Sequence, residues 1–136
     1  MSGSGSGDRE RPSDLAGTRL SGELALERKG EDVAILDLRG FEIGCDFFVM
    51  VSGRTETHVR DIADHIVDEL ARRLRARPWH IEGRAYGRWI LLDYVHWVVH
   101  IFHHEAREYY QLEHLWGDAP IERLIDAQAA PADAAE

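Results

Sequence analysis

Two short apolar runs in residues 89–102 restrict the fold of this chain more than any other feature of its sequence. They are Trp89-Ile-Leu-Leu-Asp93 and Val98-Val-His-Ile-Phe102, and only residues 94–97 separate them. Both runs are rich in the aromatic and branched aliphatic residues that strands favour. Their close spacing predicts two antiparallel strands joined as a hairpin.

A two-residue loop at Val95-His96 would give the two faces of this hairpin different characters. Side chains alternate across a strand, so one face would carry only apolar or aromatic residues: Ile90, Leu92, Tyr94, Trp97, Val99 and Ile101. The other face would mix apolar and polar residues: Trp89, Leu91, Asp93, Val98, His100 and Phe102.

The mixed face has two interpretations, which the alternation alone leaves open. It fits a protein-docking surface, where aromatic anchors stand among polar groups that set orientation. It also fits a second core face beneath a helix, with His100 hydrogen-bonded to Asp93 or to the backbone.

The preceding residues predict three strands and two helices. Short apolar runs predict buried strands at residues 33–38 and 47–51, and residues 79–82 can supply the next strand. A helix is predicted from Ser13, although Gly17 and Gly22 weaken its pattern. The apolar spacing from Val59 to Leu74 predicts a long amphipathic helix that ends before Pro78.

After the hairpin, residues 105–116 predict a helix, and residues 121–125 suggest one further short turn. The whole chain is therefore predicted to be α/β, a mixed β-sheet of about five strands with helices packed on it. We expect a single domain at residues 13–126, between a flexible Gly/Ser-rich tail at 1–12 and a loose tail at 127–136.

Composition limits the classes of function. No apolar run is long enough to cross a bilayer, and the single cysteine, Cys45, cannot form an intramolecular disulfide. We therefore expect a cytoplasmic protein without a membrane partner. The formal net charge of −9 argues against sequence-specific nucleic-acid binding and favours a basic protein partner. Surface ion pairs or protein contacts are expected for Arg84, Arg88 and Arg107, rather than contacts to RNA.

The residues of common catalytic and metal sites do not form a convincing pattern. The chain has no Asp-x-Asp pair for two metal ions, and Ser52-Gly53 alone is a weak phosphate-binding signal. His100 and His103 would point to opposite faces of a strand, which argues against a shared metal. We expect no catalytic residue, no metal and no cofactor. The alternatives are a metal-dependent nucleotidyltransferase-like enzyme and a homodimeric scaffold.

Three longer segments carry a resemblance to a known family. They are residues 82–94 (EGRAYGRWILLDY), 98–102 (VVHIF) and 107–118 (REYYQLEHLWGD), and Asp46-Phe-Phe-Val49 precedes them in the expected order. The chain resembles the ribosomal silencing factors, also called Iojap-like proteins or RsfS. The likeness extends from about Leu20 to Ala119.

This resemblance implies a protein that binds the large (50S) ribosomal subunit through its ribosomal protein fourteen. It would block joining with the small subunit sterically and repress translation when nutrients are scarce. The resemblance also implies a nucleotidyltransferase-like fold and a homodimer in the free state. The hairpin and the segment after it would then supply the partner-binding residues: Trp89, Leu91, Asp93, Tyr94, His100, Phe102, Arg107, Tyr110, Leu112 and Trp116.

The hairpin turn departs from the family pattern. Family members usually have Gly-Asp where this chain has Val95-His96, and a smaller aliphatic residue is common where it has Trp97. Glycine and aspartate tolerate the positive φ of tight hairpin turns, whereas a β-branched valine resists it. We therefore expect a wider or differently shaped turn, which puts the hairpin register in question.

Overall fold

The computed structural model describes residues 12–110 and 117–125. Its helices and strands follow one another along the chain in this order: α2 (Pro12–Glu27), β1 (Glu31–Asp37), β2 (Phe47–Gly53), α3 (Glu56–Leu74), β3 (His80–Glu82), β4 (Trp89–Asp93), β5 (Trp97–His103), α4 (His104–Tyr110) and β6 (Ile121–Arg123).

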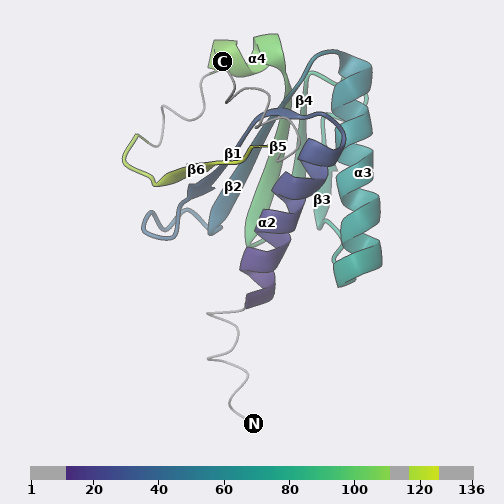
Figure 1. The fold of residues 1–136 in the computed structure, drawn as a ribbon. Helices are drawn as coiled ribbons and strands as arrows, with labels where there is room; N and C mark the ends of the chain where they lie inside the picture. The colour runs from purple at the N-terminus through teal and green to yellow at the C-terminus, as the bar shows by residue number, and fades with distance from the viewer. Residues whose placement is uncertain (1–11, 111–116, 126–136) are drawn as a thin grey trace, which may run out of the picture.

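The strands form one mixed sheet in the order β3-β4-β5-β2-β1-β6 (Figure 1). β2 and β5 are parallel, and the other neighbouring strands are antiparallel. The predicted mixed sheet with packed helices is confirmed, with six strands in place of about five. None of the helices in residues 12–110 and 117–125 combines the length and the apolar character that a membrane crossing requires.

The sixth strand is β6, at residues where a short helical turn was predicted. Ile121 pairs with Leu36 of β1, and the Leu124 backbone N–H donates to the Val33 carbonyl oxygen at 2.8 Å. Three residues are too short to display a period, so the free edge of β1 decides their conformation by supplying hydrogen-bond partners.

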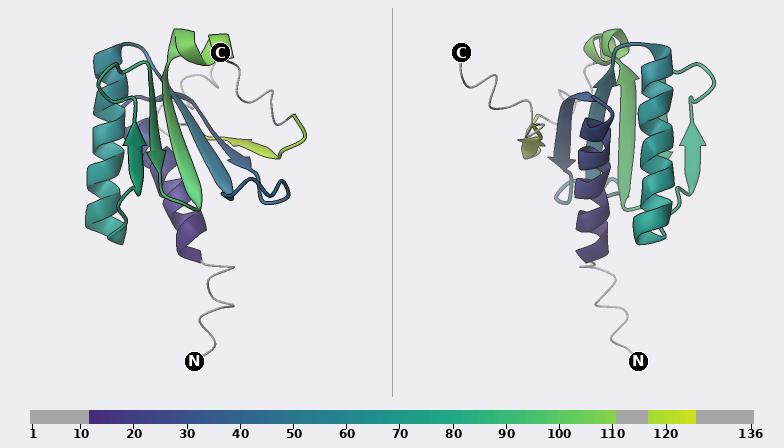
Figure 2. Two further views of the ribbon diagram at one scale, coloured as in Figure 1. Left: turned by 180° about the vertical axis from the view of Figure 1, so that it is seen from behind. Right: turned by 45° about the vertical axis from the view of Figure 1, so that its right-hand side comes forward.

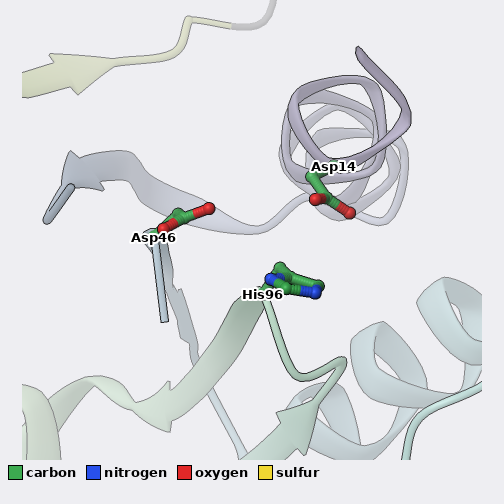
Figure 3. A group of neighbouring side chains, drawn as sticks. All are labelled: Asp14, Asp46 and His96. Atoms are coloured by element: carbon green, nitrogen blue, oxygen red, sulfur yellow. The ribbon is translucent and has the colours of Figure 1, made fainter. Parts of the chain in front are cut away.

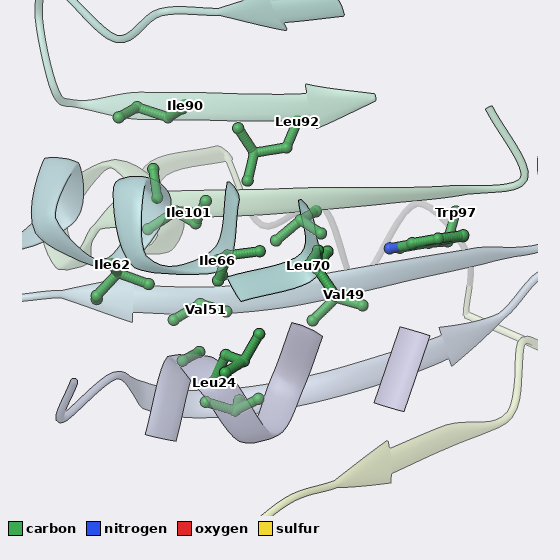
Figure 4. Packing of buried hydrophobic residues seen from close by; sticks show 14 of the residues in the cluster. Leu24, Val49, Val51, Ile62, Ile66, Leu70, Ile90, Leu92, Trp97 and Ile101 are labelled. Carbon is green, nitrogen blue, oxygen red and sulfur yellow. The ribbon is translucent and has the colours of Figure 1, made fainter. Parts of the chain in front are cut away.

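Helices α2 and α3 lie side by side on one face of the sheet (Figures 1 and 2). Figure 4 shows the layer between helices and sheet, where Ile62, Ile66 and Leu70 of α3 pack against strand residues such as Ile101. The wholly apolar hairpin face belongs to this core, as the alternation predicted.

The long helix α3 begins and ends with identifiable capping contacts. The Thr55 side chain accepts a hydrogen bond from the His58 backbone N–H at 3.0 Å, which satisfies one of the free donors of the first turn. At the other end Arg75 has a left-handed backbone, and the Ala76 N–H donates to the Leu70 carbonyl oxygen at 3.2 Å. The helix therefore closes at Leu74, a few residues before Pro78.

A glycine in α2 makes room for the largest side chain of the hairpin. A Cβ added at Gly17 would overlap the Trp97 indole ring, so the ring packs directly on the helix backbone. The Trp97 indole N–H donates to the Ser21 hydroxyl oxygen at 3.1 Å, one turn further along the helix. The glycine that weakened the sequence pattern of this helix therefore accommodates the tryptophan that departs from the family pattern.

The hairpin keeps the predicted register despite its unusual turn. Leu92 lies opposite Val99, and Leu91 lies opposite His100. The His96 N–H donates to the Tyr94 carbonyl oxygen at 2.9 Å across Val95, whose φ is 74°. This is the geometry of a γ-turn of the rare, strained kind. Of the two expected outcomes, a wider turn or a differently shaped one, the structure shows the second: the turn is tight and holds a β-branched residue at positive φ.

Candidate partner-docking face

The mixed side chains of β4 and β5 lie on the sheet face opposite α2 and α3. We call this surface the hairpin face and define it by six residues: Trp89, Leu91, Asp93, Val98, His100 and Phe102. None of the six belongs to the core cluster that contains α2 and α3. A second, smaller cluster forms on this side, and it includes Phe102, Trp89 and Phe48.

Aromatic rings form the middle of the hairpin face. The Trp89 ring centroid lies 5.0 Å from that of Phe102, and the His100 centroid lies 5.9 Å from both. From β2, Phe48 meets the His100 ring edge-on at 4.5 Å between centroids. Such contacts hold each ring in one orientation.

His100 is the polar residue at the centre of this group. The Trp89 indole N–H donates to His100 Nδ1 at 3.0 Å, and an indole nitrogen is only a donor. Nδ1 must therefore be the acceptor, which places the imidazole proton on Nε2. The side chain is 4% exposed, and burial lowers the pKa of His100 to about 4. At neutral pH it is an uncharged ring, and its buried Nε2 has no hydrogen-bond partner within residues 12–110 and 117–125.

A shallow pocket of about 300 Å³ opens on this side of the sheet. Leu91, Asp93 and Val98 of the hairpin line it, together with Phe48 and the loop before β2. Cys45 of that loop is half-buried, and burial, with the charges of nearby carboxylates, raises the pKa of its thiol to about 11. The pocket thus offers a lining that mixes apolar and polar groups, with the Asp93 carboxylate and the His100 ring among them and no thiolate nucleophile.

Burial of the hairpin face varies from residue to residue, so each of the two interpretations holds for part of it. Phe102 is fully buried and His100 nearly so, as in a core. Trp89, Leu91 and Asp93 are half-buried, as in a surface that has room for a partner. Asp93, one of the two partners considered for His100, does not bond to it: Trp89 donates to Nδ1, and the Asp93 carboxylate accepts from the Val95 backbone N–H at 2.7 Å.

Two predicted contact residues lie inside the molecule. Tyr94 is 6% exposed on the helix-covered face, where its ring stacks on Trp97. Arg107 is 8% exposed, and its guanidinium donates to the Asp32 carbonyl oxygen at 2.6 Å and to the Ser52 hydroxyl at 3.0 Å. Burial therefore argues against direct contact of either residue with a partner. Sequence alternation placed Tyr94 correctly on the apolar face, and the resemblance alone had added it to the contact set.

Three further residues predicted to contact the partner come after β5 in the sequence. Tyr110 is the last residue of α4, and its side chain is outside the described structure, as are Leu112 and Trp116. Sequence reasoning missed Phe48, because nothing local in β2 indicates that this strand pairs with β5 and brings Phe48 opposite Val98.

Two side-chain groups bear on the RNA and metal alternatives. Arg84 donates to the Asp64 carboxylate at 2.9 Å, the kind of surface ion pair that was expected. Among the described residues, one group of ligand-type side chains converges: Asp14, Asp46 and His96. It does not involve the hairpin face, and no local pattern of the sequence indicates it, because its three members lie far apart along the chain.

Comparison with known proteins agrees with this architecture. The family model "Ribosomal silencing factor during starvation" (RsfS) matches residues 14–136. The ribosomal silencing factor RsfS of Halalkalibacterium halodurans is 39% identical over 98 residues, which cover 72% of this chain and 83% of that protein. A more distant mouse relative, "Mitochondrial assembly of ribosomal large subunit protein 1", is 26% identical over 77% of this chain and 49% of its own length.

A solved structure gives the same result at the level of the fold. A protein from Chromobacterium violaceum superposes with a TM-score of 0.73 at 25% identity, covering 83% of this chain and 93% of that chain. The match of the family model over most of the chain, together with the bacterial relative, shows the family. This chain belongs to the ribosomal silencing factors, ribosome-associated regulators of the RsfS and Iojap-like type.

Proposed function

We propose that this chain docks through its hairpin face on ribosomal protein fourteen of the large subunit and so keeps the small subunit from joining. The action is steric, because the protein occupies space that the other subunit needs and no bond is made or broken. It would act in the cytoplasm and lower translation when nutrients are limited. The family description names starvation, and the mouse relative is named for the large subunit.

The observation that carries this proposal is the sheet face that α2 and α3 leave uncovered. Half-buried Leu91 lines a pocket there, and Asp93 adds a carboxylate to its lining. Half-buried Trp89 lies on the same face, packed against Phe102. Aromatic and aliphatic anchors beside a few polar groups are the usual composition at the centre of a protein interface.

Trp89 is the anchor that we favour. Its indole N–H is already bound to His100, and its ring lies against Phe102, so its orientation is set before a partner arrives. A side chain that is held in its bound conformation loses little entropy on association. The net charge of −9 matches a basic partner, whose encounter with the chain electrostatic attraction accelerates.

Sedimentation of purified ribosomal subunits with the chain tests the proposal. The wild-type chain is expected to migrate with large subunits and to reduce the yield of joined particles. Truncating a central aromatic anchor costs about 2 kcal/mol or more, so Trp89→Ala should weaken binding at least ~30-fold.

Trp79→Ala is the matched control, because Trp79 is a tryptophan of the same chain that is 76% exposed and lies outside the hairpin face. Circular dichroism must show that both variants fold. Migration with small subunits, normal joining at saturation, or equal effects of the two substitutions would each reject the proposal.

We also propose that the free chain pairs with a second copy. Trp89 and Leu91 of the hairpin face are half-buried, and the same face of a second copy is one surface that would cover them. Light scattering should give twice the chain mass at micromolar concentration. A monomer mass across the whole accessible concentration range would exclude the pair without affecting the ribosomal proposal.

A further inference from the structure

Three side chains from separate parts of the chain converge at the end of the sheet where α2 begins (Figure 3). Asp14 lies in the first turn of α2, Asp46 directly precedes β2, and His96 lies in the hairpin turn. One ligand atom from each residue lies within 4.8 Å of the other two. In Figure 3 the two carboxylates and the imidazole ring are turned toward a common space.

The backbone fixes two of these residues to each other. The Asp46 N–H donates to the His96 carbonyl oxygen at 2.7 Å, and the Phe47 N–H lies 3.4 Å from the same oxygen. The backbones of Asp46 and His96 are thus neighbours across the sheet, independently of their side-chain conformations. The tight turn at Val95 sets the direction of the chain just before His96.

The third residue is positioned by the packing of α2 on the hairpin. Trp97 contacts the helix backbone at Gly17 and bonds to Ser21, so the first turn of α2 is held next to the hairpin turn. The three possible ligands therefore come from elements whose relative positions the core already determines. Preorganisation of this kind lowers the entropic cost of binding an ion.

The donor set selects the class of ion. One imidazole nitrogen and two carboxylate oxygens are ordinary Zn²⁺ ligands at about 2.0–2.2 Å, and three protein ligands leave a fourth tetrahedral position for water. Tetrahedral ligands at such bond lengths are roughly 3.5 Å apart, so the observed atoms need to approach one another by only a modest side-chain rotation. Mg²⁺ prefers oxygen ligands alone and keeps several waters, so the imidazole nitrogen in this group favours Zn²⁺ over Mg²⁺.

We propose that Asp14, Asp46 and His96 form a zinc site that ties the start of α2 to the hairpin turn. The proposal goes beyond the docking function, because none of the three residues is part of the hairpin face. His96 is one of the two residues at which the turn departs from the family pattern, so the departure would supply the nitrogen ligand.

A competing arrangement uses the same residues without metal. Asp14 and His96 also line a pocket of about 360 Å³ that contains Arg75 and Arg77. In that case ion pairs with these arginines would neutralise the carboxylates, and no metal would be required. The two arrangements predict opposite results when zinc is titrated.

Titration of the full-length chain without a purification tag distinguishes them. Isothermal titration calorimetry and native mass spectrometry should show one Zn²⁺ per chain, and Mg²⁺ should not compete. Added Co²⁺ should give the visible absorption bands of a tetrahedral site. Thermal unfolding should shift upward with zinc concentration, because the ion binds the folded state.

Substitution of single ligands gives the decisive comparison. Mutating a residue that only hydrogen-bonds to a metal ligand commonly lowers metal affinity 10–100-fold. Removing a ligand itself, in His96→Ala or Asp46→Asn, should therefore lower zinc affinity at least ~100-fold. His80→Ala is the matched control, because His80 is exposed, pairs with Glu82 at 2.6 Å and is not one of the three converging residues.

The zinc titrations of the wild type and the variants have distinct outcomes. Stoichiometric zinc that the control retains and both ligand variants lose supports the site. No binding, or binding that His96→Ala leaves unchanged, overturns it. Either result leaves the sedimentation test of Trp89 unaffected.

Discussion

The buried His100 of the hairpin face makes the stability of the folded protein depend on pH. The ring accepts a hydrogen bond from Trp89 and is packed between Phe48 and Phe102. Burial lowers the pKa of His100 to about 4, below its usual value of 6.5, so the folded state binds this proton less readily than the unfolded state does.

The depressed pKa predicts how stability depends on pH. Between about pH 6.5 and pH 4 the unfolded chain is protonated at this residue and the folded chain is not, so stability falls as the pH is lowered through this window. The contribution has a limiting slope of about 1.4 kcal/mol per pH unit. Urea unfolding from pH 7 to pH 4 should show a shallower loss in His100→Gln than in the wild type. His80→Gln serves as the control, and parallel curves for the wild type and His100→Gln would contradict the assignment.

Val95 concentrates backbone strain in the hairpin turn. A β-branched residue at a φ of 74° is costly, and strained backbone of this kind costs on the order of 1–3 kcal/mol. Val95→Gly should relieve that strain, partly offset by the greater freedom of glycine in the unfolded chain. We expect the free energy of unfolding to rise by about 1 kcal/mol, and Val95→Ala to gain less. A loss of stability in Val95→Gly would show that the valine side chain contributes more by packing than its backbone costs.

At the scale of elements, the contact between α2 and β5 depends on a missing side chain. Gly17 lets the Trp97 ring approach the helix, and the same ring stacks on Tyr94 at 4.9 Å between centroids. An alanine would favour the isolated helix by about 1 kcal/mol but would collide with a ring that is held on several sides.

Gly17→Ala is therefore expected to destabilise the protein by about 1–3 kcal/mol in urea or thermal unfolding, against the direction that helix propensity predicts. Gly40→Ala is the control, because a Cβ there meets no atom within 4 Å. If Gly17→Ala were more stable than the wild type, the helix would have to move without cost, and the close packing of α2 on Trp97 would not matter.

At the scale of the whole molecule, shape and charge have separate roles in the proposed function. The folded body would obstruct subunit joining, and the net charge of −9 would speed its encounter with a basic partner. Salt shortens the range of electrostatic attraction from about 10 Å at 0.1 M to about 3 Å at 1 M ionic strength.

The association rate with large subunits is accordingly expected to fall roughly 10-fold or more between low and high salt, with a much smaller change in the dissociation rate. Stopped-flow or surface-based kinetics at several salt concentrations would measure both rates. An association rate that is independent of salt would show that the acidic surface does not steer docking.

Local sequence was sufficient for most elements and for the hairpin register. Alternation placed Leu91 opposite His100 and put both on the mixed face, and the structure confirms this pairing. Local pattern failed at residues 121–123, where β1 imposes a strand, and at Arg107, whose burial depends on Ser52 and Asp32. In each failure the deciding partner is far away in the sequence.

The sequence by itself determined most of the segments that form helices or strands, the two faces of the hairpin and the family. Strand alternation, helical spacing and signature residues are all patterns of neighbouring residues, so they can be read without the fold. Only the tertiary structure decided how deeply each residue of the hairpin face is buried, and that Asp14, Asp46 and His96 meet. Burial and convergence depend on which distant segments pack together, and that outcome is set by the free energy of the whole fold, which no short stretch of residues contains.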